Sequence, residues 1–339
     1  MKNFYPVEID ARSVSVANGA AAPDVVQIGN NFPAGILISE LWVTIEGTLA
    51  LTETAPGTVA DVSSLVKSIQ FRTDKHGDII EPLDGLSLKR VLNVLNHTAV
   101  PATQVTTGTG NKTFRITYKI PFGFFNDQIR PADSFVDLAK ALPLLRVSLG
   151  DPTSLVSGGT YTNRSYTATV RCAVVAADPA GDGGNFPGLM PLFSKKVFDL
   201  TSTGNQLPFE LTFGDRIVKA YIIQQLRDGV EVADILSGKI AVQINNRDMA
   251  VLPVDVNQLR DAMQQRFEME SMPTGLTPLD FNQSGKLTDQ LNLIQQTTGS
   301  AKMLADVTLG GGTTRQLNVI TIGFRQIPDV AKRDVAAAA

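Results

Sequence analysis

Short runs of apolar residues, several of them alternating with polar ones, dominate the chain and predict β-strands. Residues 36–51 alternate over part of their length, so Leu41, Val43 and Ile45 are expected on one face of a strand and Trp42 on the other. Turns that contain Gly, Asn or Asp separate the runs. The other strands predicted in this way span residues 114–120, 144–149, 166–175, 217–226, 239–244, 303–309 and 317–324.

Two segments have apolar residues at helical spacing. The first is 86–95, with Asp84 or Ser87 available as its N-cap, and the second is 256–267, which Asp255 precedes. Many short strands with one helix in each half favour two β-sandwiches over an alternating α/β chain. The buried faces expected for the helices are Leu88, Val91, Leu92 and Leu95 in the first, and Leu259, Met263 and Phe267 in the second.

The two helices lie in matching local sequence, which indicates an internal duplication. Pro82-Leu83-Asp84 is followed after three residues by Leu88-Lys89, and Pro253-Val254-Asp255 is followed after three residues by Leu259-Arg260, an offset of 171 positions. A period of this length means one domain present twice rather than a solenoid of small repeats. Weaker matches keep the same order: Gly35 and 41–43 with Gly214 and 220–222 at offset 179, 147–150 with 307–310 at offset 160, and 169–175 with 318–324 at offset 149.

The duplication divides the chain into two domains and three connecting or terminal segments. A linker is expected at 178–192 because its first residues are rich in Gly, Asp and Pro. The expected segments are an N-terminal arm at 1–22, a first sandwich at 23–177, the linker, a second sandwich at 193–328 and a C-terminal tail at 329–339.

Two tandem sandwiches with paired Pro-x-Asp-x3-Leu-Lys/Arg sequences resemble the double-jelly-roll major capsid proteins of tailless icosahedral viruses, in particular bacterial viruses with an internal membrane. The resemblance covers about residues 23–328. It implies an all-β fold of two tandem eight-stranded jelly-roll β-sandwiches, each with a short helix in an inter-strand connection. It also implies a pseudo-hexagonal homotrimer that contacts neighbouring capsomers, other capsid proteins at the vertices and the lipids of an internal membrane. The protein would then belong to the virion and be made in the host cytoplasm.

Composition narrows the function classes. The length of 339 residues exceeds the roughly 250–300 that one core supports, which agrees with two domains. The net charge of −3 includes no basic excess, so sequence-independent nucleic-acid binding is disfavoured. The single cysteine, Cys172, excludes an intrachain disulfide and indicates folding in a reducing compartment. The first ten residues lack the apolar stretch of a secretory signal.

No residue pattern predicts a catalytic residue, a cofactor site or a metal site. The two histidines, His76 and His97, have no partners at ligand spacing. The Gly-rich segment 181–185 lacks the Gly-Lys-Ser/Thr of a phosphate-binding loop. Asp178 and Asp182 have the oxygen ligands that Ca²⁺ takes, but the EF-hand spacing is absent, so a plain connecting loop is expected and a structural Ca²⁺ is the alternative.

Aromatic and basic clusters are expected to be structural or solvated. Phe122, Phe124 and Phe125 should belong to a core or a subunit interface. The pairs Lys195-Lys196 and Lys332-Arg333 should lie on a solvated face, with anionic lipid headgroups as the alternative contact.

Two competing functions remain open. A carbohydrate-binding or carbohydrate-active tandem sandwich would need aromatic platforms and paired carboxylates, whereas the chain has one Trp, inside a predicted strand. A minor capsid or spike component is the other, although one domain copy would suffice at a vertex.

Overall fold

The computed structural model describes residues 6–20, 25–29, 31–32, 37–74, 77–96, 98–122, 136–137, 142–177, 189–212, 216–245, 248–267, 269–281, 291–292 and 301–326. It divides into two compact units, and the division that follows β12 falls at Phe186/Pro187. The predicted linker region 178–188, the predicted tail and both histidines lie outside the described residues.

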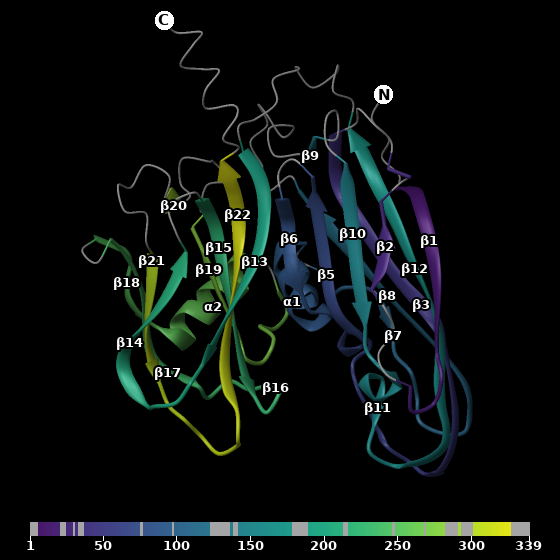
Figure 1. Ribbon diagram of the computed structural model, residues 1–339. Coiled ribbons are helices and arrows are strands. Elements are labelled where there is room, and N and C mark those ends of the chain that lie inside the picture. Colours follow the sequence, from purple (N-terminus) through teal and green to yellow (C-terminus); the bar gives the residue numbers. More distant parts are fainter. Residues whose placement is uncertain are drawn as a thin grey trace, which may run out of the picture. The chain divides into compact units, whose positions relative to one another are not determined.

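The described chain is predominantly β-strand, with one α-helix in each unit (Figure 1). The first unit contains β1 (Val7–Val16), β2 (Val26–Ile28), β3 (Leu37–Ala55), β4 (Thr58–Val59), η1 (Val62–Leu65), β5 (Val66–Thr73), β6 (Gly77–Leu83), α1 (Gly85–Leu95), β7 (Ala102–Thr103), β8 (Gly110–Pro121), β9 (Val136–Asp137), β10 (Pro143–Leu149), η3 (Pro152–Ser154), β11 (Val156–Ser157) and β12 (Thr160–Ala177). The second contains β13 (Leu189–Asp199), β14 (Gly204–Thr212), β15 (Arg216–Arg227), β16 (Val230–Glu231), β17 (Leu236–Ile244), β18 (Asp248–Asp255), α2 (Val256–Arg266), β19 (Leu276–Asp280), β20 (Leu291–Asn292), β21 (Ala301–Val307) and β22 (Arg315–Gln326).

Each unit pairs its main strands into the two sheets of a jelly roll. In the first unit the antiparallel orders are β1-β12-β3-β8 and β6-β5-β10-β2. In the second unit they are β13-β22-β15-β19 and β18-β17-β21-β14. These are the same pairings, strand for strand in chain order, and two sheets built from eight strands make a jelly roll. The tandem jelly-roll fold and the duplication are therefore confirmed.

The expected helices and strands are present. Each of the eight predicted strands corresponds to one observed strand, namely β3, β8, β10, β12, β15, β17, β21 and β22, although the prediction 303–309 runs two residues past the end of β21 at Val307. Asp84 is the N-cap of α1 and accepts a hydrogen bond from the Ser87 backbone N–H, and Asp255 is the N-cap of α2 and accepts from Asn257 N–H and Gln258 N–H. The strands before the helices run one or two residues past Pro82 and Pro253 instead of ending there.

The repeated Lys/Arg after the helix leucine fixes each helix to a different neighbour. Lys89 of α1 forms a short ion pair with Asp61, the N-cap of η1. Arg260 of α2 donates to the Pro273 carbonyl at 3.2 Å. The shared sequence therefore serves the same anchoring purpose in both units through different partners.

The N-terminal arm predicted at residues 1–22 is wrong for Val7–Val16. These residues form β1, which pairs with β12 from Val7↔Val174 to Val16↔Tyr166, just as β13 pairs with β22 in the second unit (Figure 1). A bulge at Ile9 interrupts the register, and only Val16 of the strand is buried. The apolar residues change phase across the bulge, from odd positions at Val7 and Ile9 to even positions at Val14 and Val16, which is why the pattern does not indicate one continuous strand.

Likewise, Leu189–Leu192 of the predicted linker belong to β13, so the second domain begins earlier than the predicted residue 193. The strand starts with an apolar run whose Met190, Leu192 and Phe193 are buried. A continuous apolar run carries no alternation, so the alternating pattern does not mark its start.

Two of the predicted alignments between the copies are out of register. Ile45 pairs with Val170 in the first unit, and Ile223 pairs with Val319 in the second, so Ile45 and Ile223 occupy equivalent places. Val43 and Tyr221, each two residues earlier in its strand, are then equivalent as well. The true offset along β3 and β15 is therefore 178, not 179. Residues 145 and 147 of β10 correspond to 303 and 305 of β21, an offset of 158 rather than 160. The shift of two residues between β10 and β21 leaves every side chain on its original face, so hydrophobic alternation does not reveal it. The shift of one residue between β3 and β15 is hidden for another reason: residues 220–223 of β15 are all buried apolar residues, so they show no alternation.

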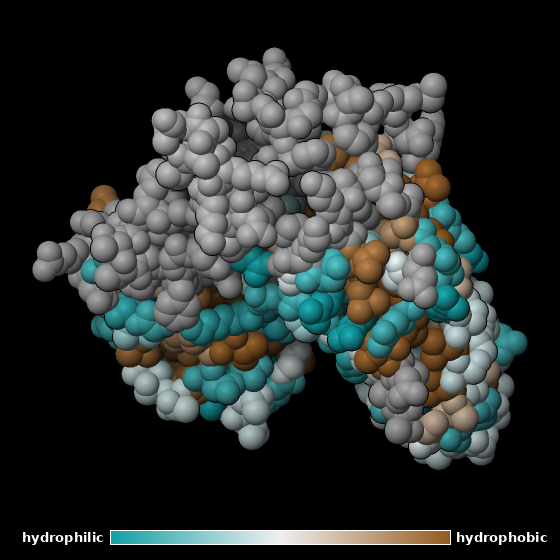
Figure 2. All heavy atoms as spheres, turned by 45° about the horizontal axis from the view of Figure 1, so that its top comes forward, coloured by the Kyte–Doolittle hydropathy of each residue, from teal (hydrophilic) through white to brown (hydrophobic). Residues whose placement is uncertain are grey.

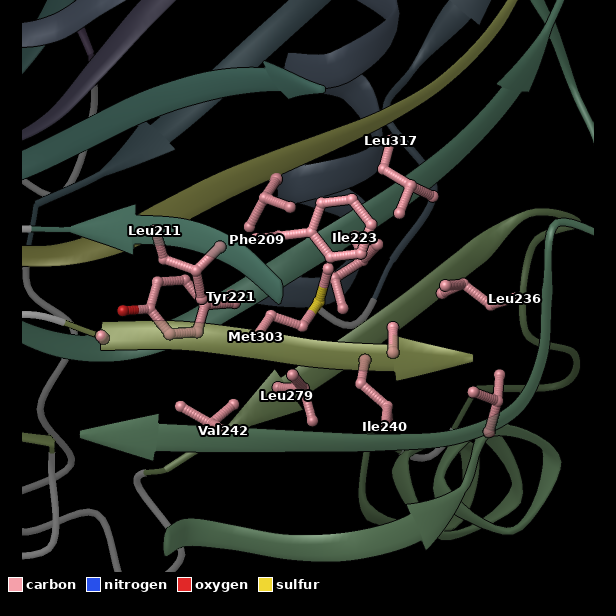
Figure 3. Packing of buried hydrophobic residues seen from close by; sticks show 14 of the residues in the cluster. Phe209, Leu211, Tyr221, Ile223, Leu236, Ile240, Val242, Leu279, Met303 and Leu317 are labelled. Carbon is pink, nitrogen blue, oxygen red and sulfur yellow. The ribbon is translucent and has the colours of Figure 1, made fainter. Parts of the chain in front are cut away.

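The core of the second unit is a continuous apolar cluster between its two sheets. Figure 3 shows residues of β14, β15, β17, β19, β21 and β22 turned toward one another, among them Tyr221, Ile240 and Met303, which have no solvent exposure. Fully burying aliphatic or aromatic side chains of this kind stabilises a fold by about 1.5–3 kcal/mol each.

In the first unit the side chain of Phe114 covers a glycine. A Cβ at Gly47 would lie 2.1 Å from the Thr167 carbonyl oxygen and 2.7 Å from Phe114 Cζ. Phe114 meets Tyr166 edge to face at a centroid distance of 6.2 Å, and the Tyr166 hydroxyl donates to the Gly150 carbonyl at 2.7 Å. Only glycine fits this position, since the aromatic ring and the β12 backbone occupy the space of a side chain.

Candidate functional site

Within the described ranges, no group of three or more His, Cys, Asp or Glu side chains could hold a metal ion. Cys172 is fully buried, and burial raises the pKa of its thiol to about 12, so the nucleophilic thiolate is suppressed at neutral pH. Asp178 and Asp182, the Ca²⁺ alternative, lie outside the described residues.

The surface with the most organised polar side chains is the outward face of β1, β12, β3 and β8, which we call the β1–β8 face. Rows of side chains run across these strands in antiparallel register. One row consists of Ser15, Thr167, Thr48 and Thr113; the next of Ser13, Thr169, Glu46 and Arg115; the next of Ala11, Arg171, Thr44 and Thr117; and the last of Ala173, Trp42 and Lys119.

Ion pairs join the strands of this face. Arg171 of β12 donates from Nε to Glu46 Oε1 of β3 at 2.7 Å and from Nη1 to Glu8 of β1 at 3.3 Å. Arg115 of β8 lies 3.8 Å from Glu46, measured from Nε to Oε2. The hydrogen bond with Glu46 is the main reason that the pKa of Arg171 is raised. Because the Arg171 and Glu46 side chains are 42% and 33% exposed, these pairs add little stability and mainly define the charge pattern of the face.

Trp42, the single tryptophan of the chain, lies on the same face. Its indole N–H donates to Glu40 Oε2 at 2.7 Å, and Lys119 Nζ lies 4.2 Å from its ring centroid. The position of Trp42 on the outward side of β3 is as predicted. One side of the ring carries the lysine cation, which is a contact typical of a cation–π pair and not of a free sugar platform.

Two hollows open on the β1–β8 face. The larger, about 670 Å³, is lined by short residues such as Ser13, Thr113 and Thr167, and the smaller, about 480 Å³, by Trp42, Pro101 and Lys119. Thr103 and Arg115 line both, so the hollows are neighbours. Their walls combine hydroxyl groups, cations and the aromatic rings of Trp42 and Phe114, a composition that suits a polar protein contact.

The equivalent face of the second unit has a different character. Ile222 of β15 and Ile320 and Ile322 of β22 have no solvent exposure, yet they point away from the core cluster that contains Tyr221 and Val319. β15 and β22 are therefore buried on both faces. The β1–β8 face of the first unit, in contrast, is largely polar and partly exposed.

The remaining predicted clusters are placed as follows. Phe122 is fully buried and stacks on Phe71 at a centroid distance of 6.0 Å, which confirms its expected core role. Phe124, Phe125, Lys332 and Arg333 lie outside the described residues. Lys195 and Lys196 are half-buried in β13, and Lys196 Nζ lies 5.4 Å from the Phe198 ring centroid, so this pair does not form a freely solvated face.

Hydrophobic residues also reach the surface. Figure 2 shows them in patches bordered by hydrophilic residues, and Leu142, Leu252 and Val230 are among the large side chains more than half exposed. Single exposed residues of this kind are common on soluble proteins and carry no assignment by themselves.

Among the described residues, no helix combines the length and the apolar character needed to cross a bilayer.

Sequence comparisons identify no relative: no family model matches the chain, and no curated protein matches it. Solved structures match over almost the whole length. The major capsid protein of Sulfolobus Turreted Icosahedral Virus superposes with a TM-score of 0.66 at 11% identity, covering 95% of this chain and 98% of that one. Major capsid protein P2 of bacteriophage PM2 superposes with a TM-score of 0.57 at 10% identity, covering 94% and 99%.

VP54 of PBCV-1 superposes with a TM-score of 0.56 at 12% identity, covering 95% of each chain. Identities this low establish a common fold and not a common activity. The chain thus has the double-jelly-roll fold found in major capsid proteins of icosahedral viruses.

Proposed function

We propose that this chain is a major capsid protein, and that three copies form a pseudo-hexagonal trimer that tiles an icosahedral virus shell. The observation that carries the proposal is the duplication itself: one chain contains two jelly rolls with identical strand pairing. Two similar domains in each of three chains give six similar wedges, so a threefold trimer can occupy a hexagonal lattice position. The end-to-end likeness to capsid proteins of three viruses supports the same function.

In this proposal the protein acts structurally and is not an enzyme. The described surface offers hydroxyl rows and exposed ion pairs, which suit contacts between proteins, and the one free thiol is protonated and buried. The partners are further copies of the chain, neighbouring capsomers and other capsid proteins at the vertices, without specific nucleic acid. The protein is made in the host cytoplasm and resides in the virion, over an internal membrane.

The mass of the protein in solution tests the proposal. Light scattering coupled to gel filtration of the full chain should give three times the 36.3 kDa of one chain, and negative-stain images should show particles of hexagonal outline. A monomer at every concentration up to the high micromolar range would contradict the proposal. Virion stoichiometry separates it from a minor or spike component, since a major protein is present in hundreds of copies and a vertex protein in few.

Contact with an internal membrane needs a separate measurement. Purified trimers should bind vesicles that contain anionic lipid more than neutral vesicles if the shell rests on lipid. Equal, negligible binding to both would remove the membrane from the proposal without affecting the capsid role.

A further inference from the structure

We infer that Asn18, in the turn that follows β1, is a deamidation site, at which the side-chain amide is converted spontaneously into a carboxylate through a cyclic imide formed with Gly19. Asn18-Gly19 is the one Asn-Gly pair in the sequence. Glycine has no side chain to shield its backbone nitrogen, so an asparagine that precedes glycine is the one most readily attacked. The inference is independent of the proposed function, and either can fail without the other.

The turn presents this pair to solvent. Asn18 and Gly19 are both exposed, and a Cβ added to Gly19 would have no atom within 4 Å. The Ala20 N–H closes the turn by donating to the Ala17 carbonyl at 3.1 Å, and Gly19 occupies the third position with φ +70°. A positive φ at that position is typical of a type II turn, which favours glycine there. Base and water can therefore reach both the Asn18 amide and the Gly19 nitrogen.

The reaction needs only base and water. Base removes the proton of the Gly19 N–H, and the nitrogen attacks Asn18 Cγ, so that an N–Cγ bond forms, the Cγ–Nδ2 bond breaks and ammonia leaves. Water then opens the five-membered imide. Opening at the Cγ carbonyl gives Asp, and opening at the backbone carbonyl gives isoaspartate, in which the chain continues through the side chain. In total, one amide and one water yield one carboxylate and one ammonium ion.

A single hydrogen bond restrains the Asn18 side chain and defines what the modification changes. Asn18 Nδ2 donates to the Thr162 carbonyl of β12 at 3.2 Å. This bond is exposed, so we expect it to slow the reaction by about fivefold or less. After deamidation the donor is gone, and a carboxylate takes its place opposite the carbonyl oxygen. The modification thus releases the turn from β12 and adds a negative charge to it.

Asn111 is a control within the same chain. It is also exposed, but it lies in β8 and precedes Lys112, which has a side chain beside its backbone nitrogen. Lys112 is paired with Leu49 of β3, so the backbone on either side of Asn111 is held extended. Imide formation requires the following nitrogen to turn toward Cγ, and strand pairing opposes that rotation. Asn111 should therefore keep its amide.

Peptide mapping by mass spectrometry of the folded full chain tests the site. The protein is incubated at pH 6 and at pH 8 in water enriched in oxygen-18, and samples are taken over several days. Asn18 should gain one labelled oxygen, faster at pH 8, and should yield both Asp and isoaspartate, while Asn111 remains unchanged. A rate at Asn18 no higher than at Asn111 would overturn the inference. Asp without isoaspartate would overturn it too, because direct hydrolysis gives only Asp.

Two variants test the structural consequence. Asn18→Asp reproduces one product of the reaction, and Asn111→Asp adds the same charge at the control position. Hydrogen exchange at the Ala20 amide, which closes the turn, should accelerate several-fold in Asn18→Asp and stay at the parent rate in Asn111→Asp. Equal exchange in both variants and the parent would contradict the release of the turn from β12.

Discussion

The duplicated N-caps allow the same substitution to be compared in two environments. Asp84 accepts from the Ser87 backbone N–H at 2.8 Å, and the buried Ser87 hydroxyl donates to its other oxygen at 2.7 Å. Asp255 accepts from the backbone N–H groups of Asn257 and Gln258, at 2.9 and 3.3 Å, and these two bonds are exposed. The same residue type therefore caps a buried helix start in one unit and an exposed one in the other.

The magnitudes follow from these contacts. Replacing an Asp N-cap with Ala costs about 1 kcal/mol, and losing a hydrogen bond from a buried hydroxyl to a carboxylate adds about 1.5 kcal/mol. We expect Asp84→Ala to destabilise the first unit by about 2–3 kcal/mol and Asp255→Ala to destabilise the second by about 1 kcal/mol. Asp84→Asn should lose much less than Asp84→Ala, because Asn also caps helices well.

Native-state hydrogen exchange measures the effect at each helix separately, which matters because a chain of two units need not unfold in one step. Exchange at α1 should accelerate in Asp84→Ala while exchange at α2 stays unchanged, and the reverse should hold for Asp255→Ala. An Asp255→Ala loss as large as that of Asp84→Ala would refute the reasoning, and so would an Asp84→Asn variant as unstable as Asp84→Ala.

Three further outcomes follow from buried or hydrogen-bonded groups. Tyr166→Phe should destabilise the protein by about 1 kcal/mol because it removes the buried hydrogen bond to the Gly150 carbonyl. Tyr118→Phe should be neutral or stabilising, because the buried Tyr118 hydroxyl has no hydrogen-bond partner among the described residues. The denaturant midpoints of the two variants test this difference, and equal losses of stability would contradict it. Cys172 should resist a thiol reagent at pH 8 until the first unit unfolds, so rapid labelling of the native protein would contradict its burial. Hydrogen bonds from the Lys239 and Gln206 backbone N–H groups lower the pKa of Asp306. The Asp306 carboxylate therefore stabilises the fold above the ordinary Asp pKa of about 4, and this stabilisation is lost as the pH falls through the lowered value. Asp306→Asn should show a smaller loss of stability below about pH 4 than the parent protein, and an unchanged acid profile would count against this account.

Long alternating strands and capped helices were predictable from the sequence because burial imposes a period on them. Leu41, Val43 and Ile45 are all fully buried, as their alternation indicates, and both helices start after the expected aspartates. β1 was not predictable in this way, because its bulge shifts the phase of the apolar positions between Ile9 and Val14, so no single alternation runs along the strand.

The β1–β8 face was beyond the reach of pattern analysis for a different reason. Its contacts join residues far apart in the chain, such as Arg171 with Glu46 and Lys119 with Trp42, and outward side chains have no apolar period to mark them. The one local signal was Trp42 itself, at an outward position of a strand. Register between strands brings the others to it, and a single sequence does not encode register visibly.

The pairing of each jelly roll's first strand with its last has a consequence for the gene. Val7 lies opposite Val174, near the two ends of the first copy, and Leu189 lies opposite Gln326 in the second. A module whose entry and exit are adjacent can be copied in tandem through a short spacer without disturbing the sheets of either copy. The same closure means that new termini could be opened in a surface loop and the old ones joined, so circularly permuted single modules are a practical route to expressing each half alone.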